Sequence, residues 1–524
     1  MIHSIELIEF RNLKNITINL GKYITAISGR NGLGKSTILA LIGNACEIKT
    51  KDGKTLFNTQ FRTEFSEIFK ASSLFDLSGS NKCKINFCDI NNRNTIVESK
   101  VCRTTWQDNK TRFRVIPETK GSNKNSRKKE WPSLYLGLSR LYPIGEVSDE
   151  NIKIKNIKLD QEEEYFRKNY IEILNLQFDN KDEVCVDMID IGGNARKKGV
   201  GINTNEYSSI TNSAGQDNIG QIILAIMSFR KLKKEYKNYK GGLLLIDEIE
   251  ATLHPRAQIK LLNFLYEASK ELNLQVVFTT HSVSLLEELS KKILKNDGNN
   301  MNDCEVYYCT KSNGPLVFYR NPSFSVMKSD LGLVMPGSNI EKITIYSEDE
   351  EARWFLSKII DKYSIFVRYV KTKLPCSILL QLNENDPMYF SNIIFVLDGD
   401  VQDETIIKNN THGNILRLPG KVRPEQVIYD FLLKLETDSQ LWQNGLQVSF
   451  TKEAIKEYGP YSAIYKGKDR ERFKRWFNKN LPLIEDLNVF NYWAENNQEE
   501  LEKFISNFKK AYNKIATRKL QPTI

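Results

Sequence analysis

The chain has 524 residues with a formal net charge of +10, and 40% of its residues are hydrophobic. This length exceeds what one hydrophobic core usually supports, so we expect two or three domains. No run of about eighteen apolar residues and no basic-then-apolar opening occurs, which predicts a cytoplasmic protein and argues against transport. The eight cysteines form no CxxC pair, which argues against a zinc site and a disulfide framework. The basic charge favours a nucleic acid as partner.

The first forty residues predict a strand, a glycine-rich loop and a helix, in that order. Apolar residues 23–27 precede the segment Gly-Arg-Asn-Gly-Leu-Gly-Lys-Ser-Thr at 29–37. This segment fits the GxxxxGK[ST] pattern, whose backbone N–H groups and helix N-terminus surround phosphate oxygens. We expect Lys35 to contact the β- and γ-phosphates of ATP and Ser36 to ligate Mg²⁺. The predicted nucleotide-binding residues of the loop are Asn31, Gly32, Gly34, Lys35, Ser36 and Thr37.

Residues 45–210 are polar and rich in lysine and asparagine, with short strand-like runs such as 84–87. We interpret this region as an insertion inside the nucleotide-binding domain. Its part from 147 to 175 has a helical composition around an acidic cluster at 162–164. That composition predicts a helical arm or a solvated helix.

Two apolar strands farther along end in side chains suited to ATP chemistry. Residues 243–246 place Asp247 and Glu248 at the carboxyl end of a strand, where open α/β sheets bind ligands. We expect Asp247 to hold Mg²⁺ and Glu248 to position or deprotonate the attacking water. The next strand, 275–278, is followed by His281, which would sense the γ-phosphate. Each feature alone also fits a structural role, but their order favours the functional one.

Ser213, Gly215 and Gln216 precede a helix expected at 219–230. A hydroxyl, a glycine N–H and a helix N-terminus together suit a phosphate. Such a group would complete an ATP site from a second copy of the chain.

These four elements together resemble the ABC ATPase superfamily, in the branch that contains SMC and RecF-like proteins. The resemblance implies an α/β P-loop ATPase domain over residues 1–325 with a helical insertion, and a homodimer in which Ser213, Gly215 and Gln216 act in trans. The signature here is Ser-Ala-Gly-Gln, where Ser-Gly-Gly-Gln is usual. Gln60 is a candidate for the glutamine that follows the P-loop in this superfamily, and Arg140 is assigned no chemistry.

A linker is predicted at 326–340, after which strands and helices alternate again to about 440. A strand at 343–347 is followed by the acidic run 348–351, and a strand at 392–397 by Asp398 and Asp400. Carboxylates grouped in this way can share a divalent cation, and phosphodiester cleavage needs such ions. For either group alone, acids that merely cap helices and turns are the alternative.

The two acidic groups resemble the TOPRIM domain, whose strand-borne glutamate would be Glu348 and whose DxD pair would be Asp398 and Asp400. An ABC-like ATPase followed by a TOPRIM-like α/β domain, here 341–440, is the arrangement of the OLD (overcoming lysogenisation defect) nucleases. The resemblance implies a DNA endonuclease that uses Mg²⁺ or Mn²⁺, often in anti-phage defence and also as a retron-associated effector. The family has a glycine where this chain has Asp349, which leaves the number of metal ions open.

OLD proteins use additional acids and a lysine downstream. The resemblance therefore offers Glu351 and Glu425 as further metal ligands and Lys474 as the catalytic lysine. Lys474 belongs to a basic stretch at 461–480, within a basic helical extension predicted for 441–524. Contact of this stretch with a DNA backbone, or an inert surface helix, are the alternatives.

Two functions remain from the sequence. One is an ATP-regulated nuclease acting on DNA, with a reverse transcriptase and its RNA–DNA hybrid, or another defence-system protein, as a candidate partner. The other is an SMC- or RecF-like clamp that closes on DNA with ATP and carries an inactive TOPRIM domain. Neither predicts a membrane partner.

Overall fold

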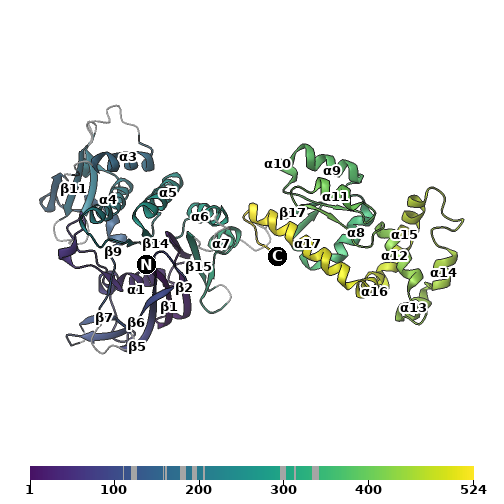
Figure 1. The fold of residues 1–524 in the computed structure, drawn as a ribbon, viewed down its shortest axis with the longest axis horizontal. Coiled ribbons are helices and arrows are strands. Elements are labelled where there is room, and N and C mark those ends of the chain that lie inside the picture. Colours follow the sequence, from purple (N-terminus) through teal and green to yellow (C-terminus); the bar gives the residue numbers. More distant parts are fainter. Residues whose placement is uncertain are drawn as a thin grey trace. The chain divides into compact units, whose positions relative to one another are not determined.

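We describe the fold from a computed structural model. The structure describes residues 1–109, 111–119, 127–156, 159, 162–176, 185–191, 198–203, 207–295, 303–311, 314–332 and 341–524. They form two compact units, Met1–Gly332 and Leu333–Ile524, and each unit is described by itself (Figure 1).

A six-stranded sheet forms the centre of the N-terminal unit, in the order β16-β15-β3-β14-β13-β9. Its strands are β3 (Ile24–Gly29), β9 (Ser133–Leu136), β13 (Gly242–Ile246), β14 (Leu274–Thr280), β15 (Cys304–Thr310) and β16 (Val317–Arg320). Neighbouring strands are parallel except β15 and β16. Every residue of β3, β13 and β14 is buried, as parallel strands covered on both faces require.

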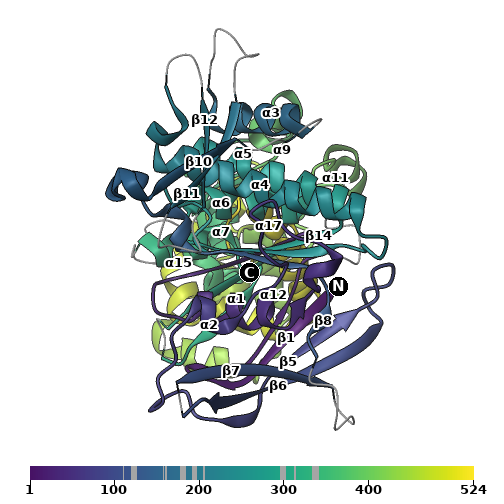
Figure 2. The same ribbon diagram turned by 90° about the vertical axis from the view of Figure 1, so that its left-hand side faces the viewer.

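Helices cover both faces of this sheet. The helix α1 (Lys35–Asn44) lies on one side, and α4 (Ala214–Glu235), α5 (Pro255–Leu272) and α6 (Val283–Lys295) lie on the other (Figures 1 and 2). The helix α1 starts directly after the glycine-rich loop that follows β3. The loop is therefore held at the carboxyl edge of the parallel strands, where the ends of β13 and β14 also lie.

A second sheet packs on the far side of α1. It is antiparallel, in the order β2-β1-β5-β6-β7. One hydrophobic core joins Ile38 and Leu41 of α1 to Ile5 of the second sheet and to Leu245 of the first. The strands are β1 (Ile2–Phe10), β2 (Leu13–Asn19), β5 (Gly79–Cys88), β6 (Ile96–Gln107) and β7 (Arg112–Thr119).

The insertion predicted for 45–210 contains long strands as well as the expected short ones, so its described part is not mainly helical. In its described part, β5, β6 and β7 continue the sheet begun by β1 and β2. Alternate inward positions of β6 hold Lys100, Cys102 and Thr104, so the apolar alternation that marks a strand is missing from the sequence. A pair of two-residue strands, β4 (Cys46–Glu47) and β8 (Lys129–Glu130), lies in the same region, with the one-turn helix α2 (Phe65–Ile68).

The predicted helical arm is also only partly helical. The helix α3 (Glu163–Leu174) lies within 147–175, but residues before it form the strand β10 (Ile152–Asn156). This strand pairs with β11 (Cys185–Ile191), which pairs with β12 (Lys198–Asn203), in an antiparallel sheet. The helix α3 packs on α4 and α5, so it is part of the domain's surface layer.

The predicted linker starts too early. Residues 326–332 belong to the helix α7 (Phe324–Gly332), in which Phe324 and Met327 are buried and which packs on α6. The proline and glycine that suggested a linker come later, at 336 and 337. Residues 333–340 lie outside the described residues.

The C-terminal unit has a parallel sheet of four strands in the order β18-β17-β19-β20. Alternate residues of a strand point to opposite faces. Ile394 and Val396 of β19 accordingly join one core, and Phe395 and Leu397 join another. The strands are β17 (Ile343–Ser347), β18 (Val367–Tyr369), β19 (Ile394–Leu397) and β20 (Ile415–Arg417).

Helices again cover both faces. The smaller core includes residues of α9 (Cys376–Asn385), α10 (Pro387–Phe390) and α11 (Asp403–Asn409). The larger core includes α8 (Glu350–Ile359), α12 (Pro424–Lys434) and the helices that follow. Those are α13 (Gln440–Gly445), α14 (Lys452–Glu457), α15 (Asp469–Asp486), α16 (Val489–Asn496) and α17 (Gln498–Arg518).

The boundary predicted between 440 and 441 does not separate two cores. Phe508 and Tyr512 of α17 belong to the same hydrophobic core as Ile343 and Ile345 of β17, and α17 packs on β17 and β20. The basic composition of 441–524 hid this packing, because the buried faces of these helices are aromatic while their exposed faces carry the charge. Among the described helices, none is both long and apolar enough to cross a membrane.

Candidate functional site

The glycine-rich loop joins β3 to α1. Gly32 and Gly34 have φ angles of 77° and 92°, a region that side-chain-bearing residues rarely adopt. The loop closes on itself through Lys35, whose Nζ donates to the carbonyl oxygens of Gly29 (2.9 Å) and Arg30 (2.8 Å). Burial lowers the pKa of Lys35. The ammonium thus lies inside the loop, in the position that suits contact with a phosphate.

Ser36 and Asp247 meet at the carboxyl edge of the sheet. The Ser36 hydroxyl donates to Asp247 Oδ1 at 2.9 Å, and the Thr279 hydroxyl donates to the same oxygen at 2.6 Å. Asp247 follows β13 and Thr279 ends β14, and these strands are neighbours. A serine hydroxyl and a carboxylate are hard oxygen ligands of the kind that Mg²⁺ prefers, so Ser36 and Asp247 would hold this ion beside the nucleotide phosphates.

Glu248 has a left-handed backbone, with φ of 48°. Its N–H donates to the Thr279 hydroxyl at 2.7 Å. Burial raises the pKa of Glu248, and the nearby Asp247 and Glu250 carboxylates add to the shift. A carboxylate with a raised pKa accepts a proton more readily, as a general base requires.

His281 follows β14 on the same edge. Its backbone N–H donates to Glu250 Oε1 at 2.5 Å, while its Nε2 is buried and has no hydrogen-bond partner in the described part of the chain. Burial lowers the pKa of His281, and the Lys35 ammonium lowers it further. A buried ring nitrogen without a partner fits a site whose ligand supplies the missing contact.

The signature segment begins α4. Ser213 is the N-cap of α4, and its hydroxyl accepts from the N–H of Gln216, whose Oε1 accepts from the N–H of Ser213 in return. A Cβ at Gly215 would lie 2.7 Å from the Thr252 carbonyl oxygen, so only glycine fits there. Ser213 remains exposed, at a helix N-terminus that favours anions.

One comparison with known protein families agrees with this geometry. Residues 44–286 match the family described as AAA ATPase domain; this range contains Asp247, Glu248 and His281. The N-terminal unit contains an ATPase domain. Such a domain binds and hydrolyses ATP, usually with Mg²⁺, and in this ATPase domain the glycine-rich loop lies just before the matched range.

Solved structures similar to this chain include SMC head domains. One from Thermotoga maritima is 15% identical, covers 61% of this chain and 98% of its own, and gives a TM-score of 0.33. Another, an SMC head domain with an extended coiled coil bound to the C-terminal domain of ScpA, derived from Pyrococcus furiosus, is 15% identical. It covers 61% of this chain and 96% of its own, and gives a TM-score of 0.36. No curated protein matches the chain.

The acids of the C-terminal unit form a second group, separate from the ATPase domain. Glu348 follows β17 and Asp398 follows β19, and these strands are paired. Glu348 Oε1 accepts from the Asp398 N–H at 2.9 Å. Burial raises the pKa of Glu348. We use the name carboxylate cluster for Glu348, Asp349, Glu351, Asp398, Asp400 and Glu425.

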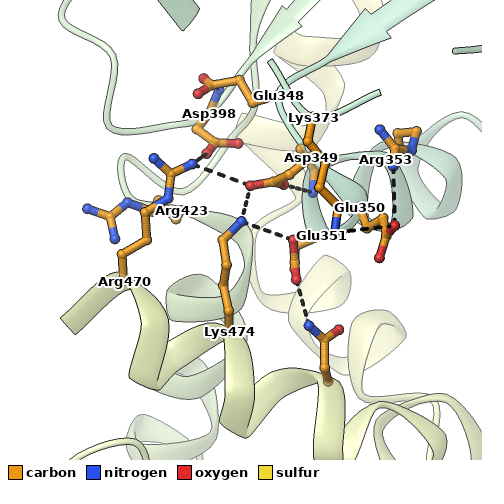
Figure 3. A network of polar contacts seen from close by, with 12 residues as sticks. Glu348, Asp349, Glu350, Glu351, Arg353, Lys373, Asp398, Arg423, Arg470 and Lys474 are labelled. Atoms are coloured by element: carbon orange, nitrogen blue, oxygen red, sulfur yellow. Dashed lines mark hydrogen bonds and ion pairs between the residues drawn. The ribbon is translucent and has the colours of Figure 1, made fainter. Parts of the chain in front are cut away.

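Cations from α15 reach into the carboxylate cluster (Figure 3). Lys474 Nζ contacts both Asp349 and Glu351, the second at 3.2 Å. Arg470 lies 3.4 Å from Asp349 and 3.9 Å from Asp398. Burial opposes ionisation of Asp349, but the Lys474 ammonium outweighs it and lowers the pKa of Asp349. Asn478, also on α15, donates to Glu351 at 2.7 Å.

Asp398 and Glu425 are the members of the carboxylate cluster that lack hydrogen bonds to one of their carboxylate oxygens. Both are buried, and Asp398 Oδ1 and Glu425 Oε1 have no hydrogen-bond partner among the described residues. Burial, reinforced by the nearby Glu348 and Asp349, raises the pKa of Asp398 to about 9. Burial also raises the pKa of Glu425 to about 7. Asp400 differs: it is exposed and pairs with Arg423 at 3.0 Å.

The cluster partly fits a divalent metal ion. Buried carboxylate oxygens without partners are the ligands that a hard cation would satisfy. Yet in the described residues no three His, Cys, Asp or Glu side chains converge on one point as metal ligands. Asp349, Glu351 and Asp400 are instead paired with lysine or arginine. Metal binding would therefore require these pairs to rearrange.

The structure brings Lys35, Ser36, Asp247, Glu248 and His281 to one edge of the central sheet. Ser213, Gly215 and Gln216 lie instead at the start of α4. Sequence reasoning missed Thr279, Arg140 and Arg470. Thr279 was visible as the end of an apolar strand, but hydroxyls are too common at such positions to stand out. Arg140 and Arg470 do not stand at a characteristic distance from any motif in the sequence. Gln60, the candidate glutamine, donates instead to the Ile48 carbonyl oxygen at 2.6 Å.

Proposed function

We propose that this chain is an ATP-hydrolysing, metal-dependent DNA endonuclease of the OLD type, which acts in bacterial anti-phage defence. The observation that carries the proposal is the carboxylate cluster: Glu348 and Asp398 are buried side by side at the carboxyl ends of paired parallel strands, and Asp398 Oδ1 has no hydrogen-bond partner among the described residues. A buried carboxylate oxygen without a hydrogen bond costs stability, and perturbed acids of this kind are typical of functional sites.

In this proposal five of the six acids of the cluster bind metal. Glu348, Asp398 and Asp400 hold Mg²⁺ or Mn²⁺, with Glu351 and Glu425 as additional ligands. The bound ion would stabilise the charge on the attacking and leaving oxygens of the phosphodiester. Lys474 is the catalytic lysine. Its ammonium lies next to Asp349 and Glu351. When these acids bind metal, the ammonium would be free to contact a phosphate oxygen.

DNA would bind over the basic face of α15 and the loop before it. Lys466, Lys468 and Arg475 are exposed there, and Tyr458 and Tyr461 are exposed by 53% and 61%. Lysine and arginine suit the phosphate backbone, and exposed aromatic rings suit unpaired bases. Because Arg470 and Lys474 of the same helix contact the carboxylate cluster, DNA bound along α15 would lie beside the acids.

The ATPase domain would act as a homodimer. Ser213, Gly215 and Gln216 would contact the ATP bound by the partner copy, as the exposed N-terminus of α4 allows. A reverse transcriptase with its RNA–DNA hybrid, or another defence-system protein, would be the regulatory partner. The identity of the genes that lie beside this one would test the proposed regulatory partner.

The second candidate function is an ATP-driven clamp on DNA without nuclease activity. The pairing of Lys474 with Asp349 favours it, as does the lack of three converging metal ligands among the residues that the structure describes. Plasmid DNA incubated with protein, ATP and Mn²⁺ separates the two functions. A nuclease nicks the plasmid, and the Asp398→Ala/Asp400→Ala variant does not; a clamp binds the plasmid and leaves it intact in both cases.

A further inference from the structure

Arg140 is a buried cation outside every motif. It lies in the short helix η2 (Leu138–Leu141), just after β9, the edge strand that pairs with β13. Only 2% of the residue is exposed. A buried arginine is costly unless each N–H donor finds an acceptor, so its partners show what holds it there.

The guanidinium of Arg140 binds the backbone of the two acidic residues that end β13. Its Nη1 donates to the Asp247 carbonyl oxygen at 2.8 Å, and its Nη2 donates to the Glu248 carbonyl oxygen at 2.9 Å. The planar guanidinium offers several donors in a fixed fork, which a lysine cannot copy. Glu248 has the left-handed φ of 48°, a strained conformation that persists only where its surroundings hold it.

The other side of Arg140 is held by α4. Its Nε donates to Asn218 Oδ1 at 2.8 Å, and Gln221 Nε2 donates to the Arg140 carbonyl oxygen at 2.9 Å. Asn218 Nδ2 also donates to the Ala251 carbonyl oxygen at 2.9 Å, just beyond Glu248. Asn218 lies little more than one turn into α4, whose N-cap is Ser213.

We propose that Arg140 is a positioning residue, which sets the backbone of Glu248 and connects it through Asn218 to the start of α4. A shift of α4 when its N-terminus meets nucleotide would then change the placement of the Glu248 carboxylate, so that closure of the dimer and hydrolysis are linked. This inference rests on the proposed roles of Glu248 and of the α4 N-terminus, but not on the nuclease.

The test measures ATP turnover together with the affinity for a fluorescent ATP analogue. Arg140→Lys and Asn218→Ala each lower kcat by about tenfold, the size expected for a misplaced catalytic group, and change the affinity by less than about twofold. The double variant loses no more than the worse single variant, because both residues act through one contact. Lys231→Ala, at an exposed site on α4, is the matched control and keeps full turnover.

Asn218→Asp separates the two contacts of Asn218. It keeps an acceptor for Arg140 and removes the donor to Ala251, so its kcat stays within about threefold of wild type. Equal losses for Asn218→Asp and Asn218→Ala would assign the effect to Ala251 and overturn the proposal. So would wild-type turnover in a folded Arg140→Lys, or a loss confined to nucleotide affinity. A Glu248→Gln variant with full turnover would instead reject the role of Glu248 itself.

Discussion

The Ser36 hydroxyl donates a hydrogen bond of 2.9 Å to the Asp247 carboxylate, although the two residues are 211 positions apart in the chain. The contact joins the glycine-rich loop to the end of β13 across the intervening strand β14. It requires the sheet order β3-β14-β13. The glycine-rich loop, the proposed metal ligand Asp247 and the proposed general base Glu248 therefore lie at one sheet edge, and the ATP-site predictions follow from this arrangement.

Lys35→Ala removes the ammonium that lies inside the loop. We expect the affinity for an ATP analogue to fall about 10- to 100-fold, which is the usual loss when one charge-assisted hydrogen bond is removed. The folded state changes little, because Lys35 donates only to loop carbonyls. Fluorescence titration measures the affinity, with Lys51→Ala, an exposed lysine outside the loop, as control. Equal affinities in the two variants would remove Lys35 from the site.

Glu248→Gln keeps the size of the side chain and removes its basicity. Because general-base catalysis contributes about 100-fold or more, kcat for ATP falls by at least that factor while nucleotide binding persists. In the proposed homodimer the trapped nucleotide would hold the two copies together, which sedimentation analysis with ATP would detect. Glu267→Gln, exposed on α5, keeps wild-type turnover. A monomeric Glu248→Gln protein with ATP would contradict the proposed homodimer.

Asp398→Asn removes an acid whose pKa is raised to about 9, against an ordinary value of 3.8. Between these values the folded protein holds a proton that the unfolded chain releases, so the acid lowers stability as the pH rises. In EDTA we expect the variant to be more stable than wild type, with a larger gain at pH 8 than at pH 5. Differential scanning calorimetry measures the gain as Tm, with Glu404→Gln on α11 as control. A gain that is the same at both pH values would refute the raised pKa of Asp398.

Lys474→Met removes the cation that contacts two buried acids. Breaking a buried ion pair leaves its partners uncompensated, so the free energy of unfolding in EDTA falls by about 3 kcal/mol. Urea denaturation measures the loss, and Lys479→Met, exposed on the same helix, serves as the matched control. Indistinguishable stabilities would mean that Lys474 does not pair with Asp349 and Glu351 in solution.

The sequence predicted the parts of the fold in which local pattern and burial agree. The strands β3, β13 and β14 are largely apolar because they are buried on both faces, so their positions followed directly, and with them the polar residues at their ends. The strand β6 was not predicted from the sequence, because the polar residues Lys100 and Thr104 occupy buried positions in it. The helix α17 was predicted as helix, but its packing on β17 depends on a long-range contact that composition does not encode.

The sequence indicated candidate residues for the two sites more readily than it indicated which side chains contact one another there. Lys474 and Glu425 were proposed through a family resemblance, and nothing local places them beside Asp349. Arg140 could not be predicted, since its partners are backbone carbonyls and an asparagine on a distant helix. Such contacts depend on tertiary structure, and a single sequence carries no pattern for them.

The most direct test measures plasmid nicking and ATP turnover in the same reaction, with Mn²⁺ and ATP, for wild type and for Asp398→Ala/Asp400→Ala. The proposal predicts that wild type nicks the plasmid and hydrolyses ATP, whereas the variant hydrolyses ATP at the wild-type rate and leaves the plasmid supercoiled. Equal nicking by both proteins, or no nicking by wild type, would contradict the assignment of the carboxylate cluster as a nuclease site.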